Sequence, residues 1–523
     1  MSYALNPQQL EAVRAIEGRV LVLAGAGSGK TRVLTERIAA LVRDHGVSPD
    51  RILAFTFTNK AAGEMRARVE KALSQRRLPF WIGTFHATGL KILRRESEHI
   101  GFRKDFAVFD EDDSLSLLKD LIRKKGLKLD ECPPAAFRSR ISRWKNALVS
   151  PEEARENAVD STDELHGEIY RRYAAALKKC NAFDFDDLIT KVVELFAAHP
   201  RVLERYARQF RYVLVDEFQD TNTIQMVMID SLASKHGNLF VVGDDDQAIY
   251  GWRGATIENI LQFDRVYEDA LVIRLEENYR STGTILDASN ALIANNAGRK
   301  GKRLWSRRGR GEAVKVCYAA DDRGEASAVR EAVIDCIRRG MRRSEIAVLY
   351  RTHAQSRAIE AAMLRGGLPY QIIGGVRFYE RREIKDLLGY LKLVQNPADD
   401  VSFRRVLNVP RRGIGAVALE RIESAAGDRN LLETIRSDGA LEGLGAVQRK
   451  RIEEFSALIA SLQVLSRAGT AHEVLAAVIE RTGYREYLHE DIRTERDRTE
   501  NVEEFVNETI RFCSSAADTA LAA

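Results

Sequence analysis

The sequence predicts an α/β protein built on a doubly wound parallel sheet, and three observations support this class. An apolar run from Val20 to Ala24 leads into a glycine-rich turn, and an amphipathic segment begins at Lys30. A β-rich stretch at 52–58 precedes a helical pattern over 60–72, and a further strand is expected at 80–85. Strands that alternate with helices in this way are typical of parallel sheets covered on both faces.

The glycine-rich turn has the sequence of a phosphate-binding P-loop. It reads AGAGSGKT over residues 24–31, with Ala24 where such loops usually carry glycine. Loop amides and a helix N-terminus bind anionic oxygens. We therefore expect Lys30 to reach the β- and γ-phosphates of a nucleotide and the Thr31 hydroxyl to ligate Mg²⁺. An ordinary glycine-rich turn is the alternative, and the sequence GKT after an apolar run disfavours it.

The composition bounds the class of protein without identifying a ligand. The 523 residues suffice for several domains, and 81 basic against 76 acidic residues give a net charge of only +5, too little to establish nucleic-acid binding. The five cysteines are scattered without metal-site spacing, which favours reduced thiols. The N-terminus does not resemble a signal peptide, and no run approaches the length of a membrane span. We expect a soluble, cytoplasmic protein.

A helical block is predicted at 96–199, inserted between strands of the first sheet. One helix there has an apolar stripe on one face and four cations on the other: Phe137, Ile141, Trp144 and Leu148, against Arg138, Arg140, Arg143 and Lys145. A solvated charged face and a phosphate-contact surface both fit these cations. Strands are expected to resume at 212–215, 239–242 and 271–275.

A second α/β unit is expected from about residue 312, without a second P-loop. Its predicted strands lie at 314–318, 346–350 and 370–373, with helices at 325–339 and 355–365. After about residue 376 the pattern is helical, with apolar sets at 452–462, 474–479 and 502–510. Within this part NVPRRGIG (408–415) could grip duplex phosphates, or it could be a plain turn between helices.

Two further motifs follow predicted strands and carry the chemistry of an ATPase. In YVLVDEFQD (212–220), Asp216 is placed to hold Mg²⁺ through water and Glu217 to polarise the attacking water. In VVGDDDQAIYGWRGA (241–255), Gln247 could sense the γ-phosphate. The same segment offers Tyr250, Trp252 and Arg253 for base stacking and a cation. These residues predict a P-loop ATPase with a surface for single-stranded nucleic acid.

Six motifs in order resemble those of the superfamily 1A DNA helicases. They are GAGSGKT (25–31), FTNKAA (57–62), GTFHA (83–87), DEFQDTN (216–222), GDDDQAIYGWRGA (243–255) and ENYRS (277–281). The Rep/UvrD/PcrA group is the most similar, and LIANN (292–296) with DFDDLI (184–189) leans toward Rep. The resemblance extends over nearly the whole chain, from LNPQQ (5–9) to GGVRFYERREIKDLL (374–388).

The resemblance implies a role for each matching residue. Gln9 would read the adenine edge, Tyr279 would stack on that base, and the P-loop would hold the phosphates. The implied ATP site comprises Gln9, Ala24, Gly25, Ala26, Gly27, Ser28, Gly29, Lys30, Thr31, Arg32 and Tyr279. The implied catalytic residues are Lys30, Glu217, Gln247 and Arg280, the last as an arginine finger, with Thr31 and Asp216 on Mg²⁺. The implied single-stranded DNA contacts are Phe57, Thr58, Asn59, Thr84, His86, Tyr250, Trp252 and Arg253.

The implied fold is a P-loop RecA-like domain and a second, incomplete RecA-like domain, each with a helical insertion. The first domain would span 1–95 and 200–278 around the insertion 96–199, and the second 279–375 with the insertion 376–523. The implied activity is ATP-dependent 3′-to-5′ DNA unwinding and translocation on single strands, in replication or repair. The implied partners are single-stranded DNA, single/double-strand junctions and replication or repair proteins, with the chain as a monomer or weak dimer.

The sequence departs from the family pattern toward its end. The motif T-L-H-x-x-K-G-L-E-F and the late motif with a second arginine finger do not occur. Loss of an arginine finger costs about 10³- to 10⁵-fold in phosphoryl transfer. The sequence therefore leaves two alternatives, an active helicase or a truncated form that binds ATP and DNA with little hydrolysis. A small-molecule kinase is disfavoured because no substrate-pocket motif accompanies the P-loop.

Overall fold

The computed structural model forms two compact units. One comprises Met1–Arg310 with Asp386–Ala523, and the other Gly311–Lys385. The structure describes residues 4–75, 79–373, 379, 381–427, 429–437, 439–489 and 495–515. The units divide at positions other than the predicted domain boundaries, which stay predictions.

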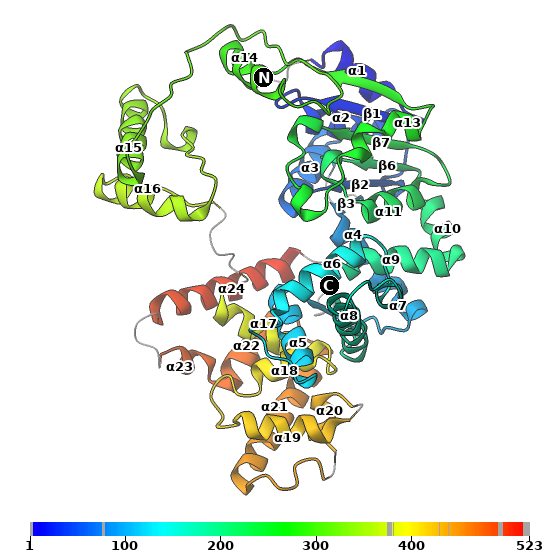
Figure 1. Cartoon of the computed structure of the whole chain (residues 1–523), viewed down its shortest axis with the longest axis vertical. Coiled ribbons are helices and arrows are strands. Elements are labelled where there is room, and N and C mark those ends of the chain that lie inside the picture. Colours follow the sequence, from blue (N-terminus) through cyan, green and yellow to red (C-terminus); the bar gives the residue numbers. More distant parts are fainter. Residues whose placement is uncertain are drawn as a thin grey trace. The chain divides into compact units, whose positions relative to one another are not determined.

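A six-stranded parallel sheet lies at the centre of the first unit. Its order is β3-β2-β6-β7-β1-β8, and Figure 1 shows the first five of these strands stacked in this order. The strands are β1 (Arg19–Ala24), β2 (Ile52–Thr56), β3 (Trp81–Thr84), β6 (Tyr212–Val215), β7 (Leu239–Gly243) and β8 (Leu271–Leu275). Each strand predicted for this sheet is confirmed. The apolar runs form parallel strands because helices bury the sheet on both faces.

Alternate residues of each strand serve two separate cores. Leu21 and Leu23 face one core, and Val20 and Val22 face the other. One face is covered by α1 (Pro7–Arg14), α2 (Lys30–Arg43) and α3 (Asn59–Ala72). The opposite face is covered by α4 (Phe85–Glu96), α9 (Asp187–Ala198), α10 (Pro200–Gln209), α11 (Thr223–Ala233), α12 (Glu258–Leu261) and α13 (Phe263–Val266). Because helices cover both faces, the carboxyl ends of the strands remain open. The loops at these strand ends, here called the open edge of the sheet, can bind ligands.

The inserted block has its own core but differs from the prediction in two ways. Its elements are β4 (Ala107–Phe109), α5 (Glu111–Lys124), α6 (Pro134–Asn146), α7 (Pro151–Glu156), α8 (Ser161–Lys179) and β5 (Ala182–Asp184). The block is not purely helical, because β4 and β5 pair in parallel. Helix α9, predicted within the block, buries Val192 and Phe196 in the core of the sheet.

The structure contradicts the predicted cationic face of α6 at Lys145, while the three arginines stay on the surface. Lys145 is buried, and its Nζ lies 2.7 Å from Asp184 and 2.8 Å from Asp187. Arg138 and Arg140 are paired with acidic side chains, Glu111 at 3.0 Å and Asp163 at 2.7 Å. Arg143 is exposed. A helical pattern shows where a cation lies on the helix but not which acidic side chain faces it.

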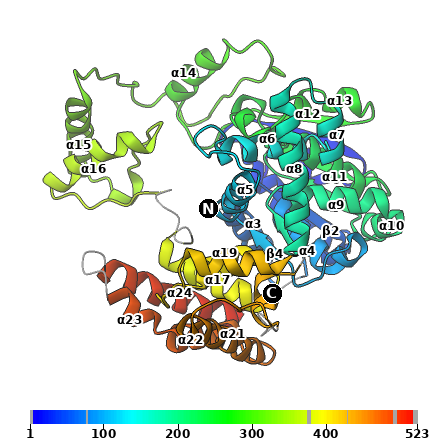
Figure 2. The ribbon, with the colours of Figure 1, turned by 60° about the horizontal axis from the view of Figure 1, so that its bottom comes forward.

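The second unit contains the two predicted helices without the predicted strands. Helices α15 (Asp322–Arg338) and α16 (His353–Arg365) lie side by side in both views (Figure 1 and Figure 2). Among the described residues, 314–318, 346–350 and 370–373 form no strand, and Tyr318 and Leu349 are more than nine-tenths exposed. A strand needs a neighbour to satisfy its backbone groups, and these segments pair with none within that part of the chain.

The C-terminal part is helical, as predicted. It begins with α17 (Arg382–Gln395). Helix α14 (Gly283–Ile293) lies earlier in the chain, after β8. The further helices are α18 (Asp400–Val406), α19 (Ala416–Ala426), α20 (Leu431–Ile435), α21 (Ala446–Ser466), α22 (Ala471–Thr482), α23 (Tyr484–His489) and α24 (Glu495–Ser515). The predicted stripe on α21 is buried: Ile452, Phe455, Ile459 and Leu462. Within the described residues, no helix is long and apolar enough to cross a membrane.

Candidate functional site

The P-loop connects the end of β1 to the start of α2 at the open edge of the sheet. Gly27 and Gly29 have positive φ angles of 69° and 91°, which favour glycine. A Cβ atom at Gly27 would lie 2.7 Å from Asn278 Nδ2, and one at Gly29 would lie 2.8 Å from Gln9 Nε2. The glycines are therefore required both by the backbone and by the side chains that close over the loop.

Gln9 and Tyr279, predicted to bind the adenine, both contact the P-loop. Gln9 is almost fully buried, and its Nε2 donates to Ser28 O at 2.8 Å. The amide nitrogen of Tyr279 donates to Gly27 O at 2.9 Å, and its ring is 40% exposed. The Tyr279 hydroxyl donates to Glu277 at 2.9 Å and accepts from Asn6 at 3.0 Å. The two residues lie beside the same loop, and adenine contact stays a prediction.

Asn278 is a site residue that the sequence analysis missed. Its Nδ2 donates to Ala26 O at 2.6 Å, and its Oδ1 accepts from the backbone of Arg280 at 2.8 Å and Ser281 at 2.7 Å. These bonds hold Arg280 beside the P-loop. The sequence signal for Asn278 was an asparagine in the motif ENYRS, directly after a predicted strand. The structure shows that its amide is buried.

Lys30 lies near two carboxylates, the predicted catalytic Glu217 and Asp244, which the sequence analysis did not single out. Its Nζ is 3.5 Å from Glu217 Oε2 and 3.8 Å from Asp244 Oδ2. Asp216 follows β6 directly, and burial, with a smaller contribution from Glu217, raises its pKa to about 7. A buried carboxylate whose charge is this poorly compensated fits a divalent cation, and Mg²⁺ prefers such oxygen ligands. Thr31, in the first turn of α2, would supply a hydroxyl oxygen.

A second missed residue, Gln219, connects the two acidic loops. It lies in the short 3₁₀ segment Phe218–Asp220 and is 1% exposed. Its Nε2 donates to Glu217 Oε2 at 3.0 Å, and its Oε1 accepts from the amide of Asp244 at 2.9 Å. Glu217 itself has a left-handed backbone (φ 49°), a strain that the surrounding contacts must hold. The orientation of the predicted catalytic base is therefore set by the loop after β7.

Gln247, the predicted γ-phosphate sensor, belongs to the same network. Its Nε2 donates to Asp244 Oδ2, the oxygen nearest Lys30. Asp244 thus connects Lys30, the predicted catalytic base Glu217 and the predicted sensor Gln247.

An aromatic surface lies on the loops that follow β2, β3 and β7. Phe57 stacks on Tyr250 with ring centroids 4.9 Å apart, and Tyr250 lies 6.4 Å from Trp252. His86 lies 5.7 Å from Phe185, which the sequence analysis missed although it stands in the DFDDLI motif. Phe57, Trp252 and Phe185 are exposed to solvent, at 38%, 75% and 53%, while Tyr250 and His86 are half-buried. Burial lowers the pKa of His86 below its ordinary value.

The predicted polar DNA contacts lie at helix N-termini. Thr58 accepts from Ala61 N at 3.1 Å at the start of α3, and Thr84 accepts from Ala87 N at 3.2 Å at the start of α4. The Thr84 hydroxyl also donates to Asn59 at 3.4 Å. These residues shape the loops, while their contact with DNA stays a prediction. The side chain of Arg253 lies outside the described residues.

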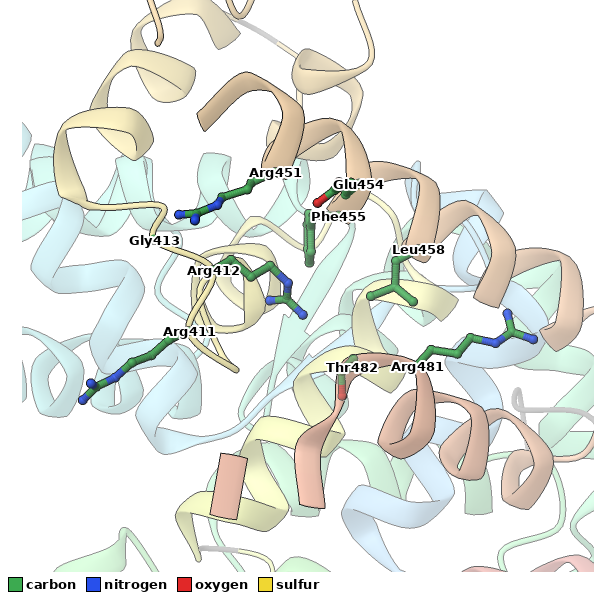
Figure 3. Close-up of a pocket in the computed structure, with 9 residues that line it drawn as sticks. All are labelled: Arg411, Arg412, Gly413, Arg451, Glu454, Phe455, Leu458, Arg481 and Thr482. Carbon is green, nitrogen blue, oxygen red and sulfur yellow. The ribbon is translucent and has the colours of Figure 1, made fainter. Parts of the chain in front are cut away.

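A cavity of about 480 Å³ lies in the C-terminal helical part, beside the loop 411–413 (Figure 3). Arg412 points inward, donates to several backbone carbonyls and lies over the ring of Phe455. Arg411 and Arg481 point away from each other (Figure 3). Of the two arginines in NVPRRGIG, Arg412 is used in contacts within the protein and Arg411 is exposed. Contact of this loop with duplex DNA stays a prediction.

Comparison with known proteins accounts for nearly the whole chain. Residues 5–268 match the UvrD/REP helicase N-terminal domain, and residues 273–514 match the UvrD-like helicase C-terminal domain. The chain is 43% identical to ATP-dependent DNA helicase PcrA of Bacillus subtilis, covering 99% of this chain and 71% of that protein. It is 42% identical to the protein of that name from Staphylococcus aureus, covering 96% of this chain and 69% of that protein.

These matches include both helicase domains and support the helicase interpretation over a truncated binding module. The expectation that the chain is a truncated form finds no support in them, and the leaning toward Rep stays a prediction. Together with the P-loop, the acidic loops and the aromatic surface on one sheet edge, they establish that this chain belongs to the UvrD/REP family of DNA helicases.

Proposed function

We propose that this chain uses ATP hydrolysis to move 3′-to-5′ along single-stranded DNA and to unwind duplex ahead of it. One observation supports the proposal: a single loop, 244–252, extends from the P-loop lysine to the aromatic surface. Its first residue contacts the P-loop lysine, and its last residues, Tyr250 and Trp252, belong to the aromatic surface. A change at the nucleotide therefore has a path of only a few residues to the DNA.

At the nucleotide, each residue has a role that follows from its place. Lys30 turns from Glu217 and Asp244 to the β- and γ-phosphates when ATP binds. Glu217, thereby released, orients and deprotonates the attacking water, and Gln247 meets the γ-phosphate. Thr31 and Asp216 would hold Mg²⁺, which would neutralise charge on the phosphate oxygens. Arg280, held beside the P-loop by Asn278, supplies positive charge to the transferring group.

At the DNA, exposed aromatic rings suit a ligand recognised by stacking rather than by sequence. Each stacked base contributes about 1–3 kcal/mol to binding, and every base offers a π-face. Phe57, Tyr250, Trp252, His86 and Phe185 form two adjacent ring groups on neighbouring loops. Single strands and single/double-strand junctions are the ligands that this surface fits. A cytoplasmic role in replication or repair, with the chain as a monomer or weak dimer, completes the proposal.

The test is DNA-stimulated ATP turnover combined with directional unwinding. We expect single-stranded DNA to increase ATP hydrolysis, and a duplex with a 3′ single-stranded tail to be unwound in preference to one with a 5′ tail. Glu217→Gln should still bind ATP and DNA but lose turnover. Binding of both ligands without any stimulated turnover in the unaltered chain would contradict the proposal and favour a nucleotide-gated binding protein.

A further inference from the structure

The loop that joins the nucleotide to the aromatic surface is held by a segment far along the chain. Residues 299–305, here called the basic strap, contain Arg299, Lys300, Lys302, Leu304 and Trp305. Lys302 is 7% exposed, and its Nζ lies 2.7 Å from Asp244, 2.9 Å from Asp246, and in contact with Asp245. One ammonium group thus contacts three consecutive carboxylates.

The contact is a built site, because other strap groups fix the same loop. Arg299 donates to both carboxylate oxygens of Asp246, from Nε at 2.9 Å and from Nη2 at 2.6 Å. The backbone amide of Lys300 donates to Asp245 at 2.8 Å. The three carboxylates lie close enough together to hold a cation, and the Lys302 ammonium lies at that position. Burial alone would lower the pKa of Lys302, but these carboxylates hold it above its ordinary value.

The far end of the strap lies against the P-loop. A methyl group at Gly25 would come within 2.1 Å of Leu304 Cδ2. The backbone of Trp305 pairs with Glu276 and Asn278, at 3.1 and 2.7 Å, and Asn278 in turn holds Ala26 of the P-loop. The strap therefore fixes the P-loop and the acidic loop relative to each other.

Asp244 is the point at which this matters for ATP. Its side chain is 2% exposed and lies between two lysines, Lys302 at 2.7 Å and Lys30 at 3.8 Å. When Lys30 turns to the phosphates, Asp244 needs another cation, since an unpaired buried carboxylate is costly. Without Lys302, Asp244 would retain Lys30, Asp246 would keep Arg299, and the carboxylate of Asp245 would lose its ammonium partner beside the site of the incoming polyphosphate.

We propose that Lys302 is a positioning residue for ATP turnover, which neutralises the carboxylates of Asp244, Asp245 and Asp246 so that Lys30 and Gln247 are free to engage the γ-phosphate. This inference rests on the proposed function. The Lys302 ammonium contacts the carboxylates of Asp244, Asp245 and Asp246. Lys302 acts through Asp244. Because the strap lies near the start of the C-terminal helicase domain, Lys302 couples the position of that segment to the nucleotide site.

The experiment compares Lys302→Ala with Lys300→Ala in the full chain. Lys300 is two residues away and carries the same charge, but its ammonium pairs with Asp264 instead of the acidic loop. We expect Lys302→Ala to raise the KM for ATP and to lower the DNA-stimulated kcat by up to about 100-fold, the cost of misplacing a reacting group by about 1 Å. Lys300→Ala should change neither.

Chemical rescue separates positioning from folding. Added n-propylammonium, which restores the missing ammonium and its N–H donors, should recover part of the turnover of Lys302→Ala. Tetramethylammonium at the same concentration, which has no N–H donor, should not. Unchanged KM and kcat in Lys302→Ala, or a loss that n-propylammonium does not recover, would overturn the inference. If the unaltered chain showed no DNA-stimulated turnover, the proposed function would fail instead, and affinity for a fluorescent ATP analogue would still test Lys302.

Discussion

Replacing Gln219 by alanine removes the bridge between Glu217, the proposed catalytic base, and the loop after β7. The substitution deletes the 3.0 Å bond to Glu217 and leaves the amide of Asp244 without its 2.9 Å acceptor. A hydrogen bond to a charged group contributes about 1.5–3 kcal/mol, and a buried unsatisfied amide costs about 1–3 kcal/mol. Because Gln219 is 1% exposed, water cannot simply replace its side chain.

The two losses have different readouts. If the Glu217 bond acts fully in the transition state, its loss lowers kcat roughly 10- to 150-fold. The unsatisfied amide lowers the free energy of unfolding by about 1–3 kcal/mol, which urea titration measures. The kinetic assay is DNA-stimulated ATP hydrolysis at saturating ATP, with a fluorescent ATP analogue to check that nucleotide still binds.

A matched control is Gln225→Ala in the next helix. Gln225 caps α11 by accepting from Asn222 N at 3.1 Å, so its loss should lower stability without lowering kcat. A folded Gln219→Ala protein with the kcat of the unaltered chain would refute the bridging role. A fall in kcat of equal size in both variants would also refute it, because the effect would then reflect general loosening.

Three further predictions concern the DNA surface, a buried ion pair and a buried acid. Trp252→Ala should raise the Kd for single-stranded DNA about 5- to 150-fold at constant salt, because the stacking of one base is lost. Fluorescence anisotropy measures this Kd. The control, Tyr318→Ala, also removes an exposed ring and should leave the Kd unchanged. Lys145→Met should lower the free energy of unfolding by about 3–5 kcal/mol in urea titration, because two buried carboxylates lose their cation; a loss below about 1 kcal/mol, the range of exposed ion pairs, would contradict the assigned burial. Burial raises the pKa of Asp399 to about 6, so the folded state holds a proton that the unfolded state has released. The stability of the protein should therefore fall as the pH rises from about 4 to about 6. Asp399→Asn keeps an acceptor for Ser402 N and should flatten this pH dependence in thermal unfolding.

Much of the first domain follows from local sequence. The strands from β1 to β8 of the large sheet were predicted because each is a short apolar run that ends in a polar or glycine-rich turn. The carboxyl ends of parallel strands all lie on the same side of the sheet. The sequence alone therefore predicts that the residues in the turns after these strands share one site. The P-loop, Asp216 and Glu217 were predicted in this way, whereas Phe57 was predicted from the family resemblance and its stacking on Tyr250 is seen only in the structure.

The predicted second sheet shows where the same reasoning fails. The apolar stretches at 314–318, 346–350 and 370–373 have the composition of strands, yet the structure places them in exposed, irregular backbone. Composition reports a preference for pleated, half-buried surface, while a strand also needs a partner for its backbone groups. The helices α15 and α16 were predicted more reliably because a helix satisfies its own backbone.

The sequence by itself determined the family, the P-loop and the order of the motifs, because each is written in contiguous residues. Only the tertiary structure decided which charges meet. It buried Lys145 on two aspartates, placed Gln219 between Glu217 and Asp244, and brought Lys302 onto a carboxylate 57 positions away. Periodicity reports which side of a helix or strand is buried, but an ion pair depends on the partner that folding brings to that side.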